Sequence, residues 1–210
     1  LSDEKFPSLA WSGSVLGLTW HHYTEYASQW DSFIYFKKIY PTGEDATSEA
    51  ILDEDARGIR PQLTWTGSEF GVIWRCEGVC FSRVSSGGDM VGEIVQVIPS
   101  GDMRTYVPLP PAWTGSEYGI VWVDNRFEEY SMQVYFARLN STGEKMGDDI
   151  MLSDPSFFLS ENPAIEWTGS EYAVAWIASQ ECCSGADFKL YFTALGGYPG
   201  YIAAIDRLWL

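Results

Sequence analysis

Short apolar stretches alternate with glycine-containing turns along the chain. Between residues 118 and 123, Tyr118, Ile120 and Trp122 take every second position, which is typical of a β-strand with one buried face. The segment just before it, 114–117 (Thr-Gly-Ser-Glu), supplies the glycine that a tight hairpin needs. No segment shows a long, well-capped apolar stripe at helical spacing. The pattern therefore predicts short antiparallel strands joined by tight turns.

This strand–turn–strand pattern occurs four times. The aligned segments are PSLAWSGSVLGLTW at 7–20, PQLTWTGSEFGVIW at 61–74, LPPAWTGSEYGIVW at 109–122 and PAIEWTGSEYAVAW at 163–176. Each segment has two tryptophans nine positions apart: Trp11 and Trp20, Trp65 and Trp74, Trp113 and Trp122, Trp167 and Trp176. The first tryptophans follow one another at intervals of 54, 48 and 54 residues. A period of about 50 residues is typical of a propeller or another repeat array.

Each repeat predicts four short strands. The first strand ends at the first tryptophan, and the second follows the tight turn. The third contains Tyr35-Phe36, Cys80-Phe81, Tyr135-Phe136 or Tyr191-Phe192, and it leads to a second turn at 41–43, 85–87 or 141–143. The fourth strand is predicted at 49–52, 93–98, 149–152 and 201–208.

A single four-stranded sheet with aromatic side chains on both faces cannot bury them by itself. Stacking such sheets buries the rings, and bending the row into a ring removes the exposed ends. We therefore predict an all-β fold, a four-bladed β-propeller of four-stranded antiparallel blades, as one domain over residues 1–210. The blades are expected at about 7–60, 61–108, 109–162 and 163–210, with the repeat tryptophans packed between them. A β-sandwich or two small β domains is the alternative.

The two ends of the chain compete for one strand position. Residues 1–3 (Leu-Ser-Asp) match residues 152–154, which close the third repeat. Residues 1–6 are therefore expected to close the last blade or to exchange into a neighbouring chain, because a surplus strand invites pairing between chains. The segment 201–208 is the other candidate for that position. A chain that begins with Leu1 also indicates a processed or trimmed form of a larger protein.

Composition narrows the class of partner. The net charge is −16, which disfavours duplex nucleic acid and anionic membrane surfaces. Hydrophobic residues are 46% of the chain, which excludes a disordered acidic tail. The mean hydropathy is −0.12, and no apolar run is long enough to span a bilayer, so membrane insertion is not expected. Aromatic residues make up 16%, which favours sheet.

The third repeat carries a resemblance to a known group of proteins. Its phrase WTGSEYGIVW at 113–122, followed by 124–126 (Asp-Asn-Arg), 134–139 (VYFARL) and Gly143, resembles the repeat of secreted bacterial β-propeller-like repeat proteins. That resemblance implies an extracellular β-repeat protein without a defined chemistry. The turn is also similar to the Asp-box of sialidases, with Glu117, Gly119 and Trp122 in matching places. Glutamate replaces aspartate there, Ser116 is displaced by one position and no arginine triad is apparent, so sialidase activity is not implied.

The cysteines favour an oxidising, extracellular setting. Cys76 and Cys80 flank a three-residue turn, where cross-strand neighbours lie close enough for a disulfide. Cys182 and Cys183 lie in the corresponding loop of the fourth repeat and are expected to form a vicinal bridge. Two cross-links between the second and fourth repeats are the alternative, and the spacing does not favour a zinc site.

The connections between second and third strands vary most, and binding residues often lie on loops held by a rigid scaffold. The candidate ligand-binding residues there are His21, His22, Tyr23, Tyr26 and Trp30 in the first repeat, and Asp124, Asn125, Arg126 and Tyr130 in the third. Aromatic rings beside carboxylates and amides suit sugar rings and their hydroxyls. For hydrolysis, Asp124 and Glu181 are nominal acid–base candidates, although no spacing selects them.

Acidic side chains supply the candidate metal ligands. Asp53, Asp55, Asp148 and Asp149 lie in short acidic segments of the kind that bind Ca²⁺. Structural Ca²⁺ is the one cofactor that the sequence suggests. Asn140 begins an Asn-Ser-Thr acceptor sequon at a predicted turn, which makes it a candidate glycosylation site.

Together these features favour a secreted, non-catalytic propeller that acts as a structural module. It is expected to self-associate into oligomers or extracellular filaments by strand exchange. A glycan-binding module is the first alternative, and a glycoside hydrolase is the second. No catalytic residues are assigned, because the fold alone decides no activity.

Overall fold

The computed structural model describes residues 2–26, 29–53, 57–99, 109–128, 131–181 and 187–196. These residues form β-strands and turns, with no helix among them. Accordingly, no helix in the described ranges is long and apolar enough to cross a membrane. The chain divides into two compact units, residues 1–101 with 142–144 and residues 102–141 with 145–210. The predicted all-β class is confirmed.

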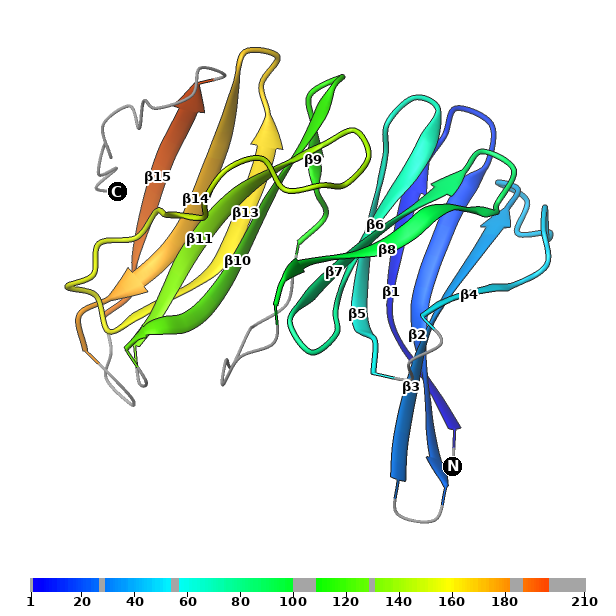
Figure 1. The fold of residues 1–210 in the computed structure, drawn as a ribbon, viewed down its shortest axis with the longest axis horizontal. Helices are drawn as coiled ribbons and strands as arrows, with labels where there is room; N and C mark the ends of the chain where they lie inside the picture. Colours follow the sequence, from blue (N-terminus) through cyan, green and yellow to red (C-terminus); the bar gives the residue numbers. More distant parts are fainter. Residues whose placement is uncertain are drawn as a thin grey trace. The chain divides into compact units, whose positions relative to one another are not determined.

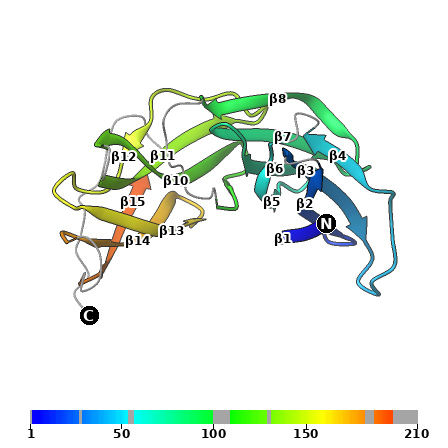
Figure 2. The ribbon, with the colours of Figure 1, turned by 90° about the horizontal axis from the view of Figure 1, so that it is seen from below.

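The first unit contains two four-stranded sheets (Figure 1). One has the order β1 (Ser2–Trp11), β2 (Leu16–Tyr26), β3 (Gln29–Ile39) and β4 (Ala50–Asp53). The other has the order β5 (Ile59–Trp65), β6 (Glu69–Arg75), β7 (Val79–Ser85) and β8 (Met90–Ile98). Neighbouring strands are antiparallel. The inner strands β1 and β5 lie side by side (Figures 1 and 2). Each sheet therefore corresponds to one predicted repeat.

The second unit contains the third and fourth repeats. Its strands are β9 (Ala112–Trp113), β10 (Glu117–Glu128), β11 (Ser131–Asn140), β12 (Ile150–Met151), β13 (Leu159–Trp167), β14 (Glu171–Ser179) and β15 (Lys189–Gly196). They form one sheet in the order β15-β14-β13-β11-β10-β9, with β12 pairing with β11. A single parallel pair, Met132 with Leu159, joins the two repeats. The strand predicted at 201–208 lies outside the described residues.

The Thr-Gly-Ser-Glu segments form the tight turns that the sequence predicts. In the second repeat, the Thr66 hydroxyl donates to the carbonyl oxygen of Glu69 at 2.9 Å and accepts from the Glu69 N–H at 3.1 Å. Between them Gly67 has a φ of 101°, a left-handed conformation that favours glycine. The same hydroxyl contacts recur at Thr114 and Thr168. The turn chemistry explains why this tetrapeptide marks each hairpin.

Glycine lets neighbouring repeats of one unit pack closely. A Cβ atom added at Gly17 would lie 2.5 Å from the Phe70 ring, and one added at Gly119 would lie 2.3 Å from the Tyr172 ring. These contacts help to bury Trp74 and Trp176, which lie on the same sheet faces as Phe70 and Tyr172, and both are at most 1% exposed. The prediction that repeat tryptophans pack between sheets fits these two residues, and Trp122 is also only 1% exposed.

The first repeat departs from that prediction. Trp11 is 50% exposed, and Trp20 is only partly buried. The second sheet of this unit covers the face of the first sheet that carries Gly17. Because successive side chains alternate between faces, Trp20 lies on the opposite face from Gly17. Trp20 therefore lies on the face of the first sheet that the second sheet does not cover.

The start of the chain has a partner within the first sheet. Residues 2–5 of β1 pair with residues 24–21 of β2. A bulge lies between Lys5 and Ser8, and Phe6 within it has a φ of 52°. The bulge allows β1 to begin at Ser2, before the repeat segment starts at residue 7. The expectation that residues 1–6 close the last blade or exchange into another chain came from the match of residues 1–3 to residues 152–154, whereas here residues 2–5 extend the first strand of their own sheet. Similar bulges extend β5 and β13 to Ile59 and Leu159, ahead of the predicted blade boundaries at 61 and 163.

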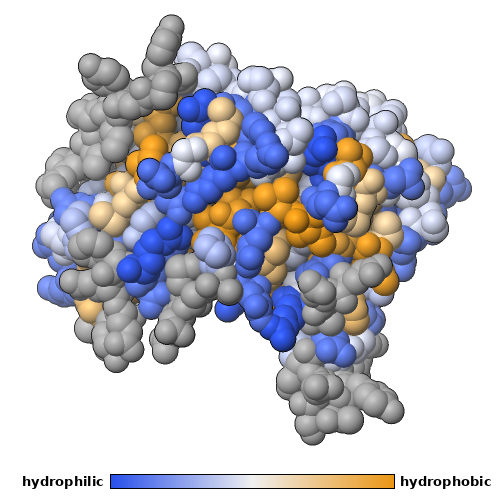
Figure 3. Space-filling view, viewed as in Figure 1, coloured by the Kyte–Doolittle hydropathy of each residue, from blue (hydrophilic) through white to orange (hydrophobic). Residues whose placement is uncertain are grey.

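No sheet closes on itself among the described residues, so the number of four blades stays a prediction. Hydrophilic side chains cover much of the face shown in Figure 3, with smaller hydrophobic groups between them. This surface accords with the net charge of −16. The pockets within each unit are therefore the places to look for specific chemistry.

Candidate functional site

The second tryptophan of each repeat lies on the second strand of that repeat, β2, β6, β10 or β14. In three repeats it stacks on the tyrosine opposite it on the next strand: Trp20 on Tyr35, Trp122 on Tyr135 and Trp176 on Tyr191, with centroid distances of 5.5, 5.9 and 5.9 Å. In the second repeat Cys80 pairs with Trp74 in place of a tyrosine. Cysteine is smaller than tyrosine, so this position differs from the other three.

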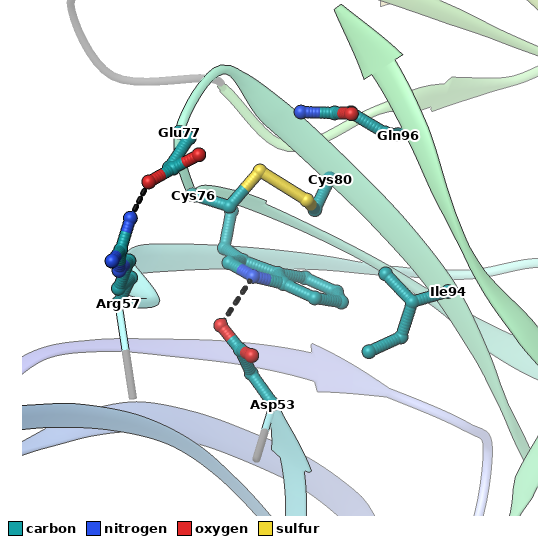
Figure 4. A pocket seen from close by; sticks show the side chains of 8 residues that line it. Asp53, Arg57, Cys76, Glu77, Cys80, Ile94 and Gln96 are labelled. Atoms are coloured by element: carbon teal, nitrogen blue, oxygen red, sulfur yellow. Dashed lines mark hydrogen bonds and ion pairs between the residues drawn. A yellow bond between two sulfur atoms is a disulfide. The ribbon is translucent and has the colours of Figure 1, made fainter. Parts of the chain in front are cut away.

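A cavity of about 480 Å³ opens at that position (Figure 4). We call it the Trp74 pocket, and its lining residues are Asp53, Arg57, Trp74, Cys76, Glu77, Cys80, Ile94 and Gln96. The predicted disulfide between Cys76 and Cys80 is confirmed, with Cα atoms 5.9 Å apart across the β6–β7 turn. The Trp74 indole Nε1–H donates to Asp53 Oδ2 at 3.1 Å, and Asp53 lies at the end of β4. The pocket is thus built between the first and second repeats.

The rim of the Trp74 pocket combines charged, amide and apolar groups. Arg57 and Glu77 form an ion pair, with 66% and 51% of their side chains exposed. Ile94 and Gln96 come from β8, and Ile94 is 38% exposed. In Figure 4 the ion pair lies on one side of the pocket and Ile94 on the other. The pocket therefore offers directional donors and acceptors beside an apolar wall.

The third repeat fills the same position with its own side chains. Asp124 is fully buried and accepts from Trp122 Nε1 at 2.8 Å, from the Arg126 backbone N–H at 3.1 Å and from Arg126 Nε at 2.8 Å. The Arg126 guanidinium lies 4.6 Å from the centre of the Tyr135 ring and also pairs with Asp149. We call these contacts the Asp124 network.

Electrostatics fixes the charge states in this network. Burial lowers the pKa of Arg126, but the hydrogen bonds to Asp124 and Asp149 outweigh it and raise the pKa above its ordinary value. Burial and the charge of Asp124 raise the pKa of Tyr135 to about 12. At neutral pH, arginine is therefore charged and tyrosine neutral. Asp124 is a buried structural acceptor here, which does not suit the acid–base role considered for it.

The structure brings several of the third-repeat candidates together. Asp124, Arg126 and Asp149 meet in one network, and Asn125 lies half-buried beside them. The side chain of Tyr130 lies outside the described residues. Asn140 is the last residue of β11 and lies just before the turn. Its glycosylation stays a prediction. Glu181 is exposed on the connection after β14.

The first-repeat candidates do not form one site. His21 is buried, accepts from the Arg60 backbone N–H at 3.0 Å and stacks on Phe6. Burial, and then the charges of Lys5 and Arg60, lower its pKa. His22 lies on the opposite face, because neighbours alternate along a strand, and its Nδ1 lies 2.5 Å from Glu4.

Tyr23 lies on the same face of β2 as His21, because alternate residues of a strand share a face. Lys5 lies 5.2 Å from the centre of the Tyr23 ring. The side chains of Tyr26 and Trp30 lie outside the described residues.

Two of the metal candidates, Asp53 and Asp149, have protein partners. Asp53 accepts from Trp74, and Asp149 pairs with Arg126 and Lys145. Asp148 is exposed, and Asp55 lies outside the described residues, as do Cys182 and Cys183. Within the described ranges no three histidine, cysteine, aspartate or glutamate side chains gather as a metal site. Structural Ca²⁺ stays a prediction.

Sequence reasoning missed Arg57, Ile94 and Gln96. Arg57 lies just before β5, and Ile94 and Gln96 lie on β8. The sequence analysis considered only the connections between second and third strands as places for ligand-binding residues. The one signal pointing here was Cys80, which replaces the tyrosine of the other repeats.

No family model and no curated protein matches this chain. Among solved structures, it is similar to the catalytic domain of a GH62 α-L-arabinofuranosidase from Coprinopsis cinerea, with a TM-score of 0.53, 10% identity, and 98% of this chain and 68% of that chain covered. For the GH43 protein BlXynB from Bacillus licheniformis the TM-score is 0.53 and the identity 11%, with 98% of this chain and 46% of that chain covered. For an acylaminoacyl peptidase from Pyrococcus horikoshii the TM-score is 0.51 and the identity 8%, with 94% of this chain and 39% of that chain covered.

The chain spans less than half the length of the last two structures. At these identities the likeness shows a propeller-like all-β fold alone. A glycosidase and a peptidase both share it, so the fold does not select an activity.

Proposed function

We propose that this chain binds neutral carbohydrate and that the Trp74 pocket is its binding site. The observation that carries the proposal is the lining of that pocket. Two carboxylates, a guanidinium and a primary amide surround a cavity of about 480 Å³ with an apolar wall. Ligand pockets usually measure about 300–1,000 Å³, so this one has room for a short oligosaccharide segment.

The lining matches the chemistry of a sugar. Each sugar hydroxyl both donates and accepts hydrogen bonds, so its pocket needs both kinds of partner. Arg57 donates, Glu77 accepts, and the Gln96 amide does both. Ile94 offers apolar surface to the C–H face of a sugar ring. The net charge of −16 disfavours anionic ligands.

The solved structures add support from a different direction. Of the structures described above, one is named as a GH62 α-L-arabinofuranosidase and one as a GH43 protein. The disulfide accords with an extracellular setting, where glycans are accessible.

A glycan array of neutral oligosaccharides tests the proposal, followed by calorimetric titration of the hits. Arg57→Ala and Gln96→Ala should each lower affinity about tenfold, which corresponds to the loss of one good hydrogen bond. Arg83→Ala is the matched control, because Arg83 pairs with Glu69 at the opposite end of β6. Its affinity should equal that of the unaltered chain. Absence of any hit, or full affinity in both pocket variants, would overturn the proposal.

Hydrolysis is the second candidate, favoured by the GH62 and GH43 likeness. Glycosidases generally use two carboxyl groups across the scissile bond, and Asp53 and Glu77 are the two in this pocket. Trp74 donates a hydrogen bond to Asp53, and Arg57 pairs with Glu77. Release of reducing ends from an array hit would establish turnover, and Asp53→Asn and Glu77→Gln should then abolish it while leaving binding.

Assembly by strand exchange stays a prediction with less support. Residues 2–5 already pair with β2 of their own sheet. Sedimentation of the chain with and without residues 1–6 tests it directly, since exchange through this strand requires a fall in particle mass on deletion.

A further inference from the structure

Neighbouring repeats of one unit pack through two different faces of their sheets. The face of the first sheet that carries Gly17 lies against the Phe70 ring of the second repeat. The face of the third repeat that carries Gly119 lies in the same way against the Tyr172 ring of the fourth. We call the first kind of face the glycine face of a repeat and the second kind, which carries the ring, its ring face. The same junction between a glycine face and a ring face thus occurs once in each unit.

A phenylalanine on the third strand of each glycine face completes this junction. Phe36 lies 5.3 Å from Phe70, and Phe136 lies 5.1 Å from Tyr172, measured between ring centroids. Both phenylalanines are buried in the core that the two repeats of their unit share. The junction therefore buries equivalent apolar positions in both units.

The first repeat has an open ring face. In the part of the first unit that the structure describes, no sheet covers this face, because the second sheet lies on the glycine face. Register and alternation place five large apolar side chains on it: Leu9, Trp11, Leu16, Leu18 and Trp20. Leu9 is 56% exposed, whereas Leu63, its equivalent in the second repeat, is 2% exposed. A hollow of about 520 Å³ opens here, with Leu18, Trp20 and Ile39 in its lining. An exposed apolar face of this kind is typical of an interaction surface.

The fourth repeat has an open glycine face. The third repeat packs on the opposite face, so among the described residues of the second unit no strand covers this one. Its apolar side chains are Ala173, Ala175, Ile177, Leu190 and Phe192. Leu190 is 45% exposed, whereas Val134, its equivalent in the third repeat, is fully buried. The two open faces are therefore the two halves of one junction.

The residues at the centres of the two open faces are matched in size. Counted from the second tryptophan, Ala173 stands where the other three repeats have glycine. Leu16 stands where the other three repeats have phenylalanine or tyrosine. A Cβ atom at Gly17 would lie 2.5 Å from the Phe70 ring, so an alanine excludes a ring at that place. A leucine is smaller than a ring, so Leu16 can pack on Ala173 where Phe70 packs on Gly17.

We propose that the ring face of the first repeat binds the glycine face of the fourth repeat of a second copy of this chain. Both faces are open on a single chain, so each copy offers one half of the junction to each of two neighbours. The contact joins two different surfaces, which makes it heterologous and produces head-to-tail dimers and larger rings or filaments. Neither face contains a residue of the Trp74 pocket, so assembly and carbohydrate binding are separate properties.

Sedimentation velocity of the chain at about 1–100 μM measures this assembly. We expect dimers and larger species that increase with protein concentration. The net charge of −16 makes copies repel one another, so assembly should strengthen between about 50 and 500 mM sodium chloride. A chain that stays monomeric under all these conditions, as it would if another occupant covered the two faces, would overturn the proposal.

One substitution on each face tests the surfaces separately. Leu9→Glu on the ring face and Leu190→Glu on the glycine face each place an unpartnered carboxylate in the contact, so each should raise the dissociation constant at least about tenfold. Both positions are exposed, so both variants should keep the circular dichroism spectrum of the unaltered chain. Met146→Glu is the matched control, because Met146 is 41% exposed in the connection between β11 and β12 and lies on neither face. Undiminished assembly of either face variant would contradict the proposal.

Mixing the two face variants tests the head-to-tail arrangement. The Leu9→Glu chain keeps its glycine face, and the Leu190→Glu chain keeps its ring face. An equimolar mixture should therefore regain a dimer and stop there, because only altered faces remain at its two ends. A mixture that assembles no better than either variant alone would show that the two faces do not bind each other.

Discussion

Truncation of Asp124 should destabilise the second unit more than any surface change. Asp124→Ala removes the acceptor of three hydrogen bonds and leaves the buried Trp122 N–H without its partner. Breaking a fully buried ion pair costs about 3–5 kcal/mol. Arg126 is 31% exposed and keeps Asp149, so part of that cost is recovered. We therefore expect a loss of about 2–4 kcal/mol in the free energy of unfolding.

Urea unfolding followed by tryptophan fluorescence and far-ultraviolet circular dichroism measures this change. Because the chain divides into two compact units, the transitions seen by the two probes are compared for coincidence. Asp148→Ala is the control, because it removes the same charge from an exposed position of the same unit and should change stability by less than about 0.5 kcal/mol. A loss below about 1 kcal/mol for Asp124→Ala would refute the reasoning, since it would mean that the network contributes no more than a surface pair.

Three further predictions concern packing, cross-linking and pH. Gly119→Ala places a Cβ 2.3 Å from the Tyr172 ring and should cost about 1–3 kcal/mol in a melting or urea experiment, whereas Gly196→Ala, with no atom within 4 Å, should cost less than about 0.5 kcal/mol. Reduction of the described disulfide, which spans a separation of 4 residues, should lower the stability of the first unit by about 2 kcal/mol, and equal stability under reducing conditions would contradict this. Because the folded pKa of His21 lies below 6.5, the unfolded chain binds the proton first as pH falls, so this contribution to stability is present above 6.5 and lost below it. His21→Gln should flatten that part of the pH profile, and a profile that is the same in both chains counts against the assignment.

The strands were predictable because their signals are local. Alternation at Tyr118, Ile120 and Trp122 and the glycine of each Thr-Gly-Ser-Glu turn depend only on neighbours in sequence. The Cys76–Cys80 disulfide was predictable for the same reason, since its partners flank one turn.

The candidate site was only partly predictable, because its pocket joins distant segments. Asp53 was selected as a metal ligand, but its partner is the Trp74 indole, twenty-one positions away. Gln96 joins the same pocket from β8, and no spacing in the sequence relates the two.

The most direct test of carbohydrate binding is a backbone ¹H–¹⁵N map of the chain titrated with the tightest neutral oligosaccharide from the array. The account predicts saturable shifts clustered at residues 53, 57, 76–80 and 94–96, which surround the Trp74 pocket. Shifts confined to other surfaces, or none at saturating sugar, would contradict it.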